Sequence, residues 1–248
     1  MVHRRPGSSN ESEAGLRYLE GRGGPFLRVY LERKDLVVLR GPTGDWLVDG
    51  DEVKDLAGRD GAEDRALLDE YAGLCRNFLS LTRPDQVRIV RIEEREVVPR
   101  AREPELALTF QGDELPVVFP EARIAEEARG LRWLLVESPD FQIVGSPEDD
   151  GAERALFGLD PGTDEVRLAI LGPPGDGPLV GPGSVLVLLG RYRDLDGGWR
   201  VPRSLSIRPV DRTSAGRGFA RLEAVELWLK NASRLNTGLG PRAFLPPR

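Results

Sequence analysis

Residues 181–210 read GPGSVLVLLGRYRDLDGGWRVPRSLSIRPV and contain the strongest structural signal in the chain. The run at 184–189 is apolar, short and rich in valine, as in a strand covered on both faces. Residues 194–198 form a turn cluster whose glycines tolerate a positive φ. The returning arm alternates, and Arg203 interrupts its apolar face, which comprises Trp199, Val201, Leu205 and Ile207. The stretch therefore predicts a β-hairpin.

Two amphipathic helices and several further strands are predicted around this hairpin. Apolar residues at three- and four-residue spacing predict helices over about 63–81 and about 219–235. Strand-like runs separated by turn residues lie at 26–48, 87–98, 106–119, 131–136 and 165–171. Because short turns force neighbouring strands to be antiparallel, the predicted fold class is α+β. We expect antiparallel sheets or a partly open barrel built from hairpins, with the two helices.

The domain organisation follows from where periodicity begins and where turn residues gather. Residues 1–24 lack periodicity and are predicted to be a mobile N-terminal tail. Residues 25–248 form the globular region, as one domain or two. If this region divides, the boundary falls near 99–104 or within 172–183, where proline and glycine are frequent.

The rare residue types exclude several kinds of catalytic site. The only histidine is His3 and the only cysteine is Cys75, which falls in a helical apolar pattern. Ser-His-Asp and Cys-His catalysis and zinc sites built from His and Cys are therefore excluded. A lone cysteine also forms no internal disulfide, which is typical of a reducing compartment. With no secretory signal and no bilayer-length apolar run, the predicted location is cytoplasmic and no membrane partner is expected.

Charge is distributed unevenly along the chain. Its 35 basic and 41 acidic residues give a net charge of −6. Residues 184–248 carry 12 basic and five acidic side chains, or +7, so the preceding part carries −13. Such asymmetry favours an anionic partner for the basic segment, or attraction between the two parts within one fold.

Arginines of the basic segment are the first candidate site. Guanidinium groups fork onto phosphate oxygens, and the interleaved Tyr192 and Trp199 could stack on bases. The glycines at 213–218, before the predicted last helix, would let an anion approach the helix start. The alternative is a solvated hairpin face with Trp199 in the core. The candidate anion-binding residues are Arg191, Arg193, Arg200, Arg203, Arg208, Arg212 and Arg217.

An acidic stretch is the second candidate site. Asp45, Asp49, Asp51 and Glu52 lie close in sequence and are followed by Lys54. Neighbouring carboxylates can hold Mg²⁺ or Mn²⁺, and a nearby lysine could help to activate water. The alternative is a solvated acidic loop.

Three functions are compatible with these patterns. The preferred hypothesis, which leans away from an enzyme, is a non-catalytic binding or assembly protein without a cofactor. Its basic hairpin and helix start would contact nucleic acid or an acidic protein surface. The second is a metal-dependent phosphodiesterase or nuclease that uses the carboxylates. The third is a structural subunit of a larger assembly, of unknown oligomeric state. In each case Arg203 is expected at a strand edge, paired with an acid, or facing a ligand.

Overall fold

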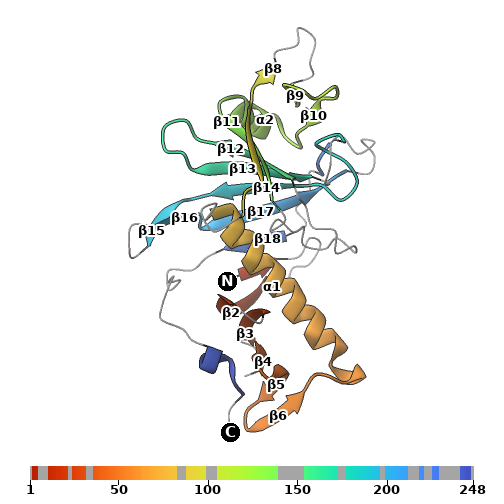
Figure 1. Cartoon of the computed structure of the whole chain (residues 1–248), viewed down its shortest axis with the longest axis vertical. Helices are drawn as coiled ribbons and strands as arrows, with labels where there is room; N and C mark the ends of the chain where they lie inside the picture. The colour runs from red at the N-terminus through yellow and green to blue at the C-terminus, as the bar shows by residue number, and fades with distance from the viewer. Residues whose placement is uncertain are drawn as a thin grey trace.

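One large sheet dominates the structure, which is a computed structural model (Figure 1). The structure describes residues 2–4, 11–21, 24–31, 36–82, 88–98, 105–138, 154–172, 177–195, 199–211, 218–220, 225–228 and 241–246.

The sheet has 13 strands, and each neighbouring pair in it is antiparallel. In spatial order the strands are β6 (Glu52–Asp55), β5 (Gly44–Asp49), β4 (Leu36–Gly41), β3 (Gly24–Leu31), β2 (Glu11–Gly21), β1 (Val2–Arg4), β18 (Val225–Trp228), β17 (Ser204–Pro209), β14 (Val185–Gly190), β13 (Val166–Gly172), β12 (Arg154–Leu159), β11 (Arg132–Glu137) and β7 (Arg91–Arg95). Most neighbours in space are also neighbours in sequence, as hairpin connections require.

The long helix α1 (Ala62–Thr82) packs against one face of this sheet, which we call the inner face. Its buried residues Leu68, Tyr71, Ala72 and Cys75 recur at three- and four-residue spacing, so they lie on one side of the helix. They share a core with inner-face side chains from both halves of the sheet, including Leu27, Val29, Val38, Phe157, Leu171, Val187 and Leu205. The two halves of the sheet therefore meet around α1.

The order of the strands explains this position. Strand β6 forms one edge of the sheet, and the short helix η1 (Arg59–Gly61) leads from it directly into α1. The next strand in the chain is β7, at the opposite edge. α1 thus connects the two edges across the inner face. Burying an apolar side chain such as Leu68 contributes about 1.5–3 kcal/mol.

The other face, called the outer face, carries a second core beside β11–β14. It is covered by α2 (Ala122–Arg129) and by a small sheet of β8 (Val97–Val98), β9 (Ala107–Phe110) and β10 (Val117–Val118). Trp133 is fully buried there, and its Nε1 donates to the Ala128 carbonyl oxygen at 2.9 Å. The ring of Phe110 meets it edge-on, with centroids 5.1 Å apart.

Near β3 and β4 the outer face is covered by the short helix η4 (Pro241–Phe244). The fully buried Phe244 ring lies 6.0 Å from that of Phe26. A Cβ atom at Gly41 would lie only 2.0 Å from the Phe244 carbonyl oxygen, so this contact requires glycine. In Figure 1, η4 (dark blue) and α1 lie on opposite sides of β2–β6.

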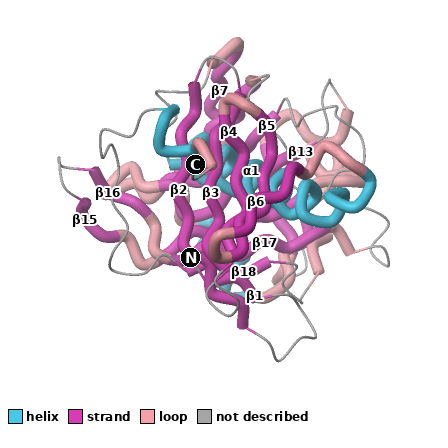
Figure 2. Tube along the Cα trace, turned by 90° about the horizontal axis from the view of Figure 1, so that it is seen from below, coloured by secondary structure: helices cyan, strands magenta, loops and turns pink. Residues whose placement is uncertain are grey.

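A two-stranded ribbon, β15 (Arg193–Leu195) and β16 (Trp199–Val201), extends from the main sheet between β14 and β17. Figures 1 and 2 both show it at the side of the molecule, away from β2–β6. Together with β14 and β17 it forms the hairpin region of residues 181–210.

The α+β class predicted from the sequence is wrong, because the protein is mostly β. The chain has α1 over Ala62–Thr82, but no long helix over 219–235. Val225–Trp228 is instead strand β18, which pairs with β1 and β17. Hydrogen-bonding partners on both sides of this strand outweigh the helical spacing of its apolar residues. Residues 221–224 and 229–240 lie outside the described part.

Strands β1 and β2 lie within the first 24 residues, where the sequence predicted a mobile tail. Their sequences show little alternation of apolar and polar residues, but β18 supplies hydrogen-bonding partners for β1, and β3 supplies them for β2. Whether residues 25–248 fold as one domain or two stays a prediction, as does a boundary near 99–104 or 172–183.

The contact between Gly41 and η4 can be tested by substitution. We expect Gly41→Ala to lower the free energy of unfolding by about 1–3 kcal/mol, the usual range for an overpacked site. The control is Gly58→Ala, because nothing lies within 4 Å of a Cβ at Gly58. Urea unfolding followed by circular dichroism measures both, and equal stability of the two variants would contradict the docking of η4.

Candidate functional site

The hairpin arginines are the first candidate site. Arg203 lies between β16 and β17, where the β15–β16 pair ends and the β14–β17 pair begins. The backbone N–H of Arg203 donates to the carbonyl oxygens of Gly190 (3.0 Å) and Arg191 (3.2 Å). Arg191 has φ 55°, which is uncommon for a residue other than glycine. The alternation of side chains is interrupted at this bend, between the end of β16 and the start of β17. Arg203 is assigned to the apolar face only if residues 199–208 are treated as one continuous strand.

Arg200 is held by acidic residues of the chain itself. Its Nη1 lies 2.5 Å from Oε1 of Glu165, a side chain only 7% exposed, and its Nε lies 3.1 Å from the exposed Asp194. Arg167 approaches Glu165 from the neighbouring position, with Nη2 3.4 Å from Oε2. A buried carboxylate between two arginines joins the ribbon β15–β16 to the start of β13.

Tyr192 makes a second link between the hairpin and β13. Its hydroxyl donates to the Val166 carbonyl oxygen at 2.5 Å, and the Arg167 guanidinium lies 5.6 Å from its ring centre. Burial is the main cause that raises the pKa of Tyr192 above its ordinary value, and the nearby Glu165 acts in the same direction. Tyr192 is therefore a neutral hydrogen-bond donor at physiological pH.

The described arginines Arg208, Arg191 and Arg193 also have contacts within the fold. Arg208 is buried on β17, and its Nη2 lies 3.3 Å from Oε1 of Glu121 at the start of α2. Arg191 and Arg193 also have interaction partners. Arg212 and Arg217, with the predicted helix start at 213–218, lie outside the described residues. The contacts that the structure describes favour attraction within the fold.

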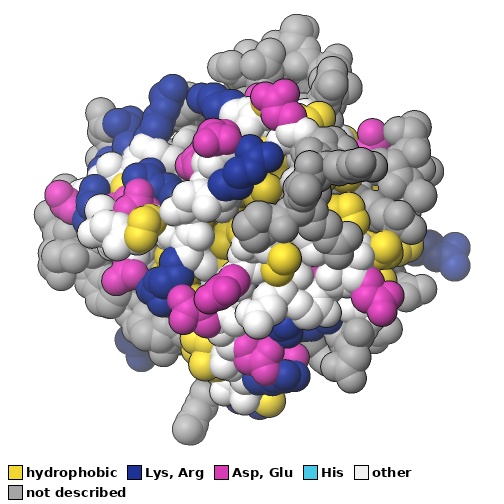
Figure 3. Space-filling model, turned by 90° about the horizontal axis from the view of Figure 1, so that it is seen from above, with side chains coloured by type: hydrophobic (Ala, Val, Ile, Leu, Met, Phe, Trp, Pro, Cys, Tyr) yellow, Lys and Arg dark blue, Asp and Glu magenta, His cyan; other side chains and the backbone are white. Residues whose placement is uncertain are grey.

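Figure 3 shows one face of the molecule, seen from above. Basic and acidic side chains are interleaved on the face that it shows. Ion pairs between neighbouring side chains include Arg129 with Glu126 at 2.8 Å and Arg95 with Glu93 at 2.9 Å.

The second candidate site, the acidic stretch, is divided between different contacts. Asp45 faces α1 from β5 and accepts a fork from Arg40, with Nε–Oδ1 at 2.9 Å and Nη2–Oδ2 at 2.8 Å. Asp49 and Glu52 are opposite one another in the β5–β6 hairpin, and Asp51 is exposed in its turn. Among the described residues, no three His, Cys, Asp or Glu side chains are grouped so that they could hold a metal ion.

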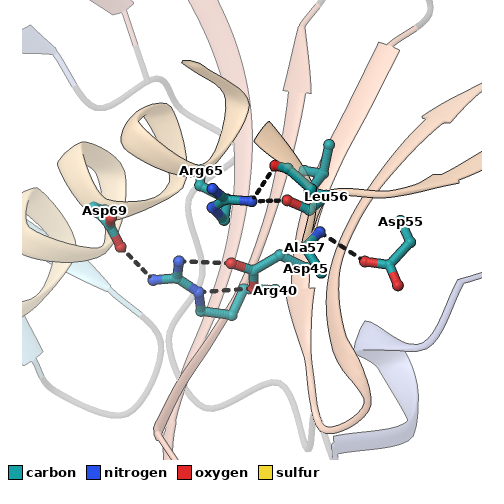
Figure 4. A network of polar contacts seen from close by, with 8 residues as sticks. Arg40, Asp45, Asp55, Leu56, Ala57, Arg65 and Asp69 are labelled. Atoms are coloured by element: carbon teal, nitrogen blue, oxygen red, sulfur yellow. Dashed lines mark hydrogen bonds and ion pairs between the residues drawn. The ribbon is translucent and has the colours of Figure 1, made fainter. Parts of the chain in front are cut away.

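Arg40 connects this stretch to α1 (Figure 4). Its Nη1 donates to Oδ1 of Asp69 on the helix at 2.7 Å, so one guanidinium joins β4, β5 and α1. The hydrogen bonds with Asp45 are the largest cause that raises the pKa of Arg40, while burial opposes the shift. Arg65, one turn earlier, donates to the carbonyl oxygens of Leu56 and Gly58. These contacts hold the beginning of α1 against β4–β6.

The inner face carries a feature that the sequence patterns did not identify as a site. Five residues in register form a line across five strands, which we call the apolar row: Ile92, Val136, Ala155, Leu171 and Val185. Four of them are buried, but Ile92 on the edge strand β7 is 55% exposed. Val90, just before this strand, is 72% exposed. The alternation of Val90 and Ile92 with Arg91 and Glu93 was the available signal.

The comparisons with known proteins give distant similarities only. No protein-family model and no curated protein matches the chain. It is similar to the crystal structure of a domain assigned to outer membrane lipoprotein sorting in Vibrio parahaemolyticus, with 12% identity and a TM-score of 0.45 over 98% of this chain and 85% of that one. It is also similar to a DUF1329 family protein from Desulfovibrio piger, with 12% identity and a TM-score of 0.42 over 98% and 86%. No residue role is transferred from either protein.

Two expectations from the sequence are corrected at this point. The cytoplasmic location and the nucleic-acid partner are both contradicted, and the hairpin arginines Arg200 and Arg208 pair with Glu165 and Glu121 of the chain itself. Neither expectation is kept. None of the described helices is long and apolar enough to cross a bilayer.

Glu165 provides a test of the internal role of Arg200. We expect Glu165→Gln to lower the free energy of unfolding by about 1.5–3 kcal/mol, because Arg200 and Arg167 would lose the buried carboxylate with which they form ion pairs. The matched control is Asp194→Asn, since Asp194 also contacts Arg200 but is 81% exposed, and we expect about 0–1 kcal/mol there. Urea unfolding compares the two. Equal, small losses would mean that Glu165 does not join the ribbon to the sheet.

Cys75 provides a pH-dependent test of the α1 core. Burial raises the pKa of Cys75 to about 12, so the folded thiol stays protonated at neutral pH. We expect no reaction of the native protein with Ellman's reagent and full reaction in urea. An unfolded thiol has a pKa of about 8.5. Stability should therefore be unaffected by this group below that pH and fall as the pH rises above it. Rapid labelling of the native protein would contradict the packing of α1.

Proposed function

We propose that this protein is a binding protein whose inner sheet face, at the β7 edge, receives an apolar ligand such as the acyl chain of a lipid or of a lipid-modified protein. The observation that carries this proposal is the apolar row. It begins at the exposed Ile92 and continues through side chains that are all buried and apolar.

The exposed end of the row has a free-energy cost that a ligand would remove. Fully burying a side chain such as valine or isoleucine contributes about 1.5–3 kcal/mol. Val90 and Ile92 are both more than half exposed, and the half-buried Leu134 lies on β11, two residues from Val136, the register partner of Ile92. Adjacent exposed apolar side chains at a sheet edge are typical of a binding surface.

The sequence-derived alternative, an acidic protein surface bound by the hairpin arginines, has less support. Such a partner would compete with the contacts of Arg200 to Glu165 and of Arg208 to Glu121. The phosphodiesterase alternative needs clustered carboxylates, and among the described residues Asp45 is engaged by Arg40 instead. Both remain untested, and neither is preferred.

A fluorescent fatty acid tests the proposal. We expect cis-parinaric acid to bind the full-length protein. We expect Ile92→Glu to weaken this binding by about tenfold or more, since the glutamate charge would have to be desolvated beside the bound acyl chain. Val53→Glu is the matched control, because Val53 is an exposed apolar residue of the other edge strand, β6, and its side chain lies on the outer face.

Two results would reject this function. One is the absence of saturable binding by the wild-type chain. The other is equal binding by Ile92→Glu and Val53→Glu, which would place any apolar ligand elsewhere.

A further inference from the structure

Two arginines face one another on the outer face of β2 and β3, away from the inner-face site. Arg17 on β2 is directly opposite Arg28 on β3. Paired residues of an antiparallel ladder point to the same face with Cβ atoms about 4.5–5.5 Å apart. Because Leu27 and Val29 pack toward α1, alternation places Arg28, and with it Arg17, on the outer face. Like charges directly opposite one another destabilise a sheet.

No acidic side chain relieves this repulsion in the part of the chain that the structure describes. Arg17 is exposed, and its described contact is with the Tyr30 ring, 5.7 Å from the ring centre. Arg28 lies 6.0 Å from the same ring and donates through Nη2 to the Leu245 carbonyl oxygen at 3.0 Å. Two positive charges thus share one aromatic ring and a neutral carbonyl.

Arg28 also has an unused donor. Its Nε is buried and has no hydrogen-bond partner, which is costly for a charged group. An anion held between the two guanidinium groups would accept from this N–H and balance both charges. The neighbouring Arg17 is exposed, so a ligand can reach its guanidinium from solvent.

The geometry holds Arg28 in place while leaving Arg17 accessible. Tyr30 is two residues after Arg28 on the same face, and the residue opposite Tyr30 is Gly15, which has no side chain to displace the ring. The carbonyl of Leu245, next to η4, fixes one end of the Arg28 guanidinium. Of the two arginines, only Arg17 has to reorient when a ligand arrives.

We infer that Arg17 and Arg28 form a binding site for a phosphate-class oxyanion. Guanidinium groups match phosphate oxygens through forked hydrogen bonds, and a dianion neutralises two of them. The same chemistry is offered by inorganic phosphate and by the headgroup of an anionic phospholipid. This site lies on the opposite face from the apolar row, so it goes beyond the proposed function and does not depend on it.

Two probes distinguish these sources with the full chain. Calorimetric titration and thermal unfolding measure inorganic phosphate, with acetate at equal ionic strength for comparison. Co-sedimentation measures vesicles of phosphatidylcholine with and without phosphatidic acid. We expect phosphate, and not acetate, to raise the melting temperature, since a ligand that binds the folded state stabilises it.

Arg17→Ala is the decisive variant, because its exposed side chain can be removed without opening the core. We expect it to weaken binding by about tenfold or more, as loss of one charged fork would. Arg28→Lys should also weaken binding, since lysine keeps the charge and loses the fork. Arg132→Ala is the control, because Arg132 is an exposed strand arginine whose charge is already paired with Asp164 at 2.7 Å. Circular dichroism verifies that each variant is folded.

Each result decides the inference. Phosphate binding that Arg17→Ala weakens and Arg132→Ala keeps supports the site with a free phosphate. Binding to phosphatidic acid vesicles alone, with the same dependence, supports it with a lipid headgroup. Equal stabilisation by acetate, no binding to either probe, or binding unchanged in Arg17→Ala would overturn it.

Discussion

The packing of α1 against the inner face is the interaction on which the other features depend. The helix follows one edge strand, β6, and leads to the opposite edge strand, β7. Leu68, Tyr71 and Cys75 then share one core with strands from both halves of the sheet. Arg40 and Arg65 fix the beginning of the helix by polar contacts. The buried members of the apolar row belong to the core that this helix shares with the sheet, whereas Ile92 at the β7 edge is exposed.

Charge has two different roles in this fold. Arg200 and Arg208 come from the basic end of the chain and pair with Glu165 and Glu121 from the acidic part. The uneven charge along the sequence is thus used, at these positions, to join distant segments. A buried or half-buried carboxylate beside a guanidinium needs this compensation. Arg17 and Arg28 are a contrast, since strand pairing brings two like charges together without such a partner in the described chain.

Local patterns identified many strands but assigned the wrong class. Turn glycines and alternating side chains located the hairpin at 181–210 and the pairing of β9 with β10. The apolar spacing over 219–235 predicts a helix, but Val225–Trp228 within it is strand β18, because short apolar runs fit either structure. The candidate sites were harder to predict from the sequence than the strands. Arg17 fell in a segment without periodicity, and the exposure of Ile92 depends on which strand is last in the sheet.

The sequence by itself determined the antiparallel hairpins and the buried Cys75. These depend on residue type and on spacing within a few positions. Only the tertiary structure decided the order of the 13 strands, the strand identity of β18, and which faces of β2, β3 and β7 meet solvent. The physical reason is that a strand is completed by hydrogen bonds from its neighbours, and those neighbours lie far away in sequence.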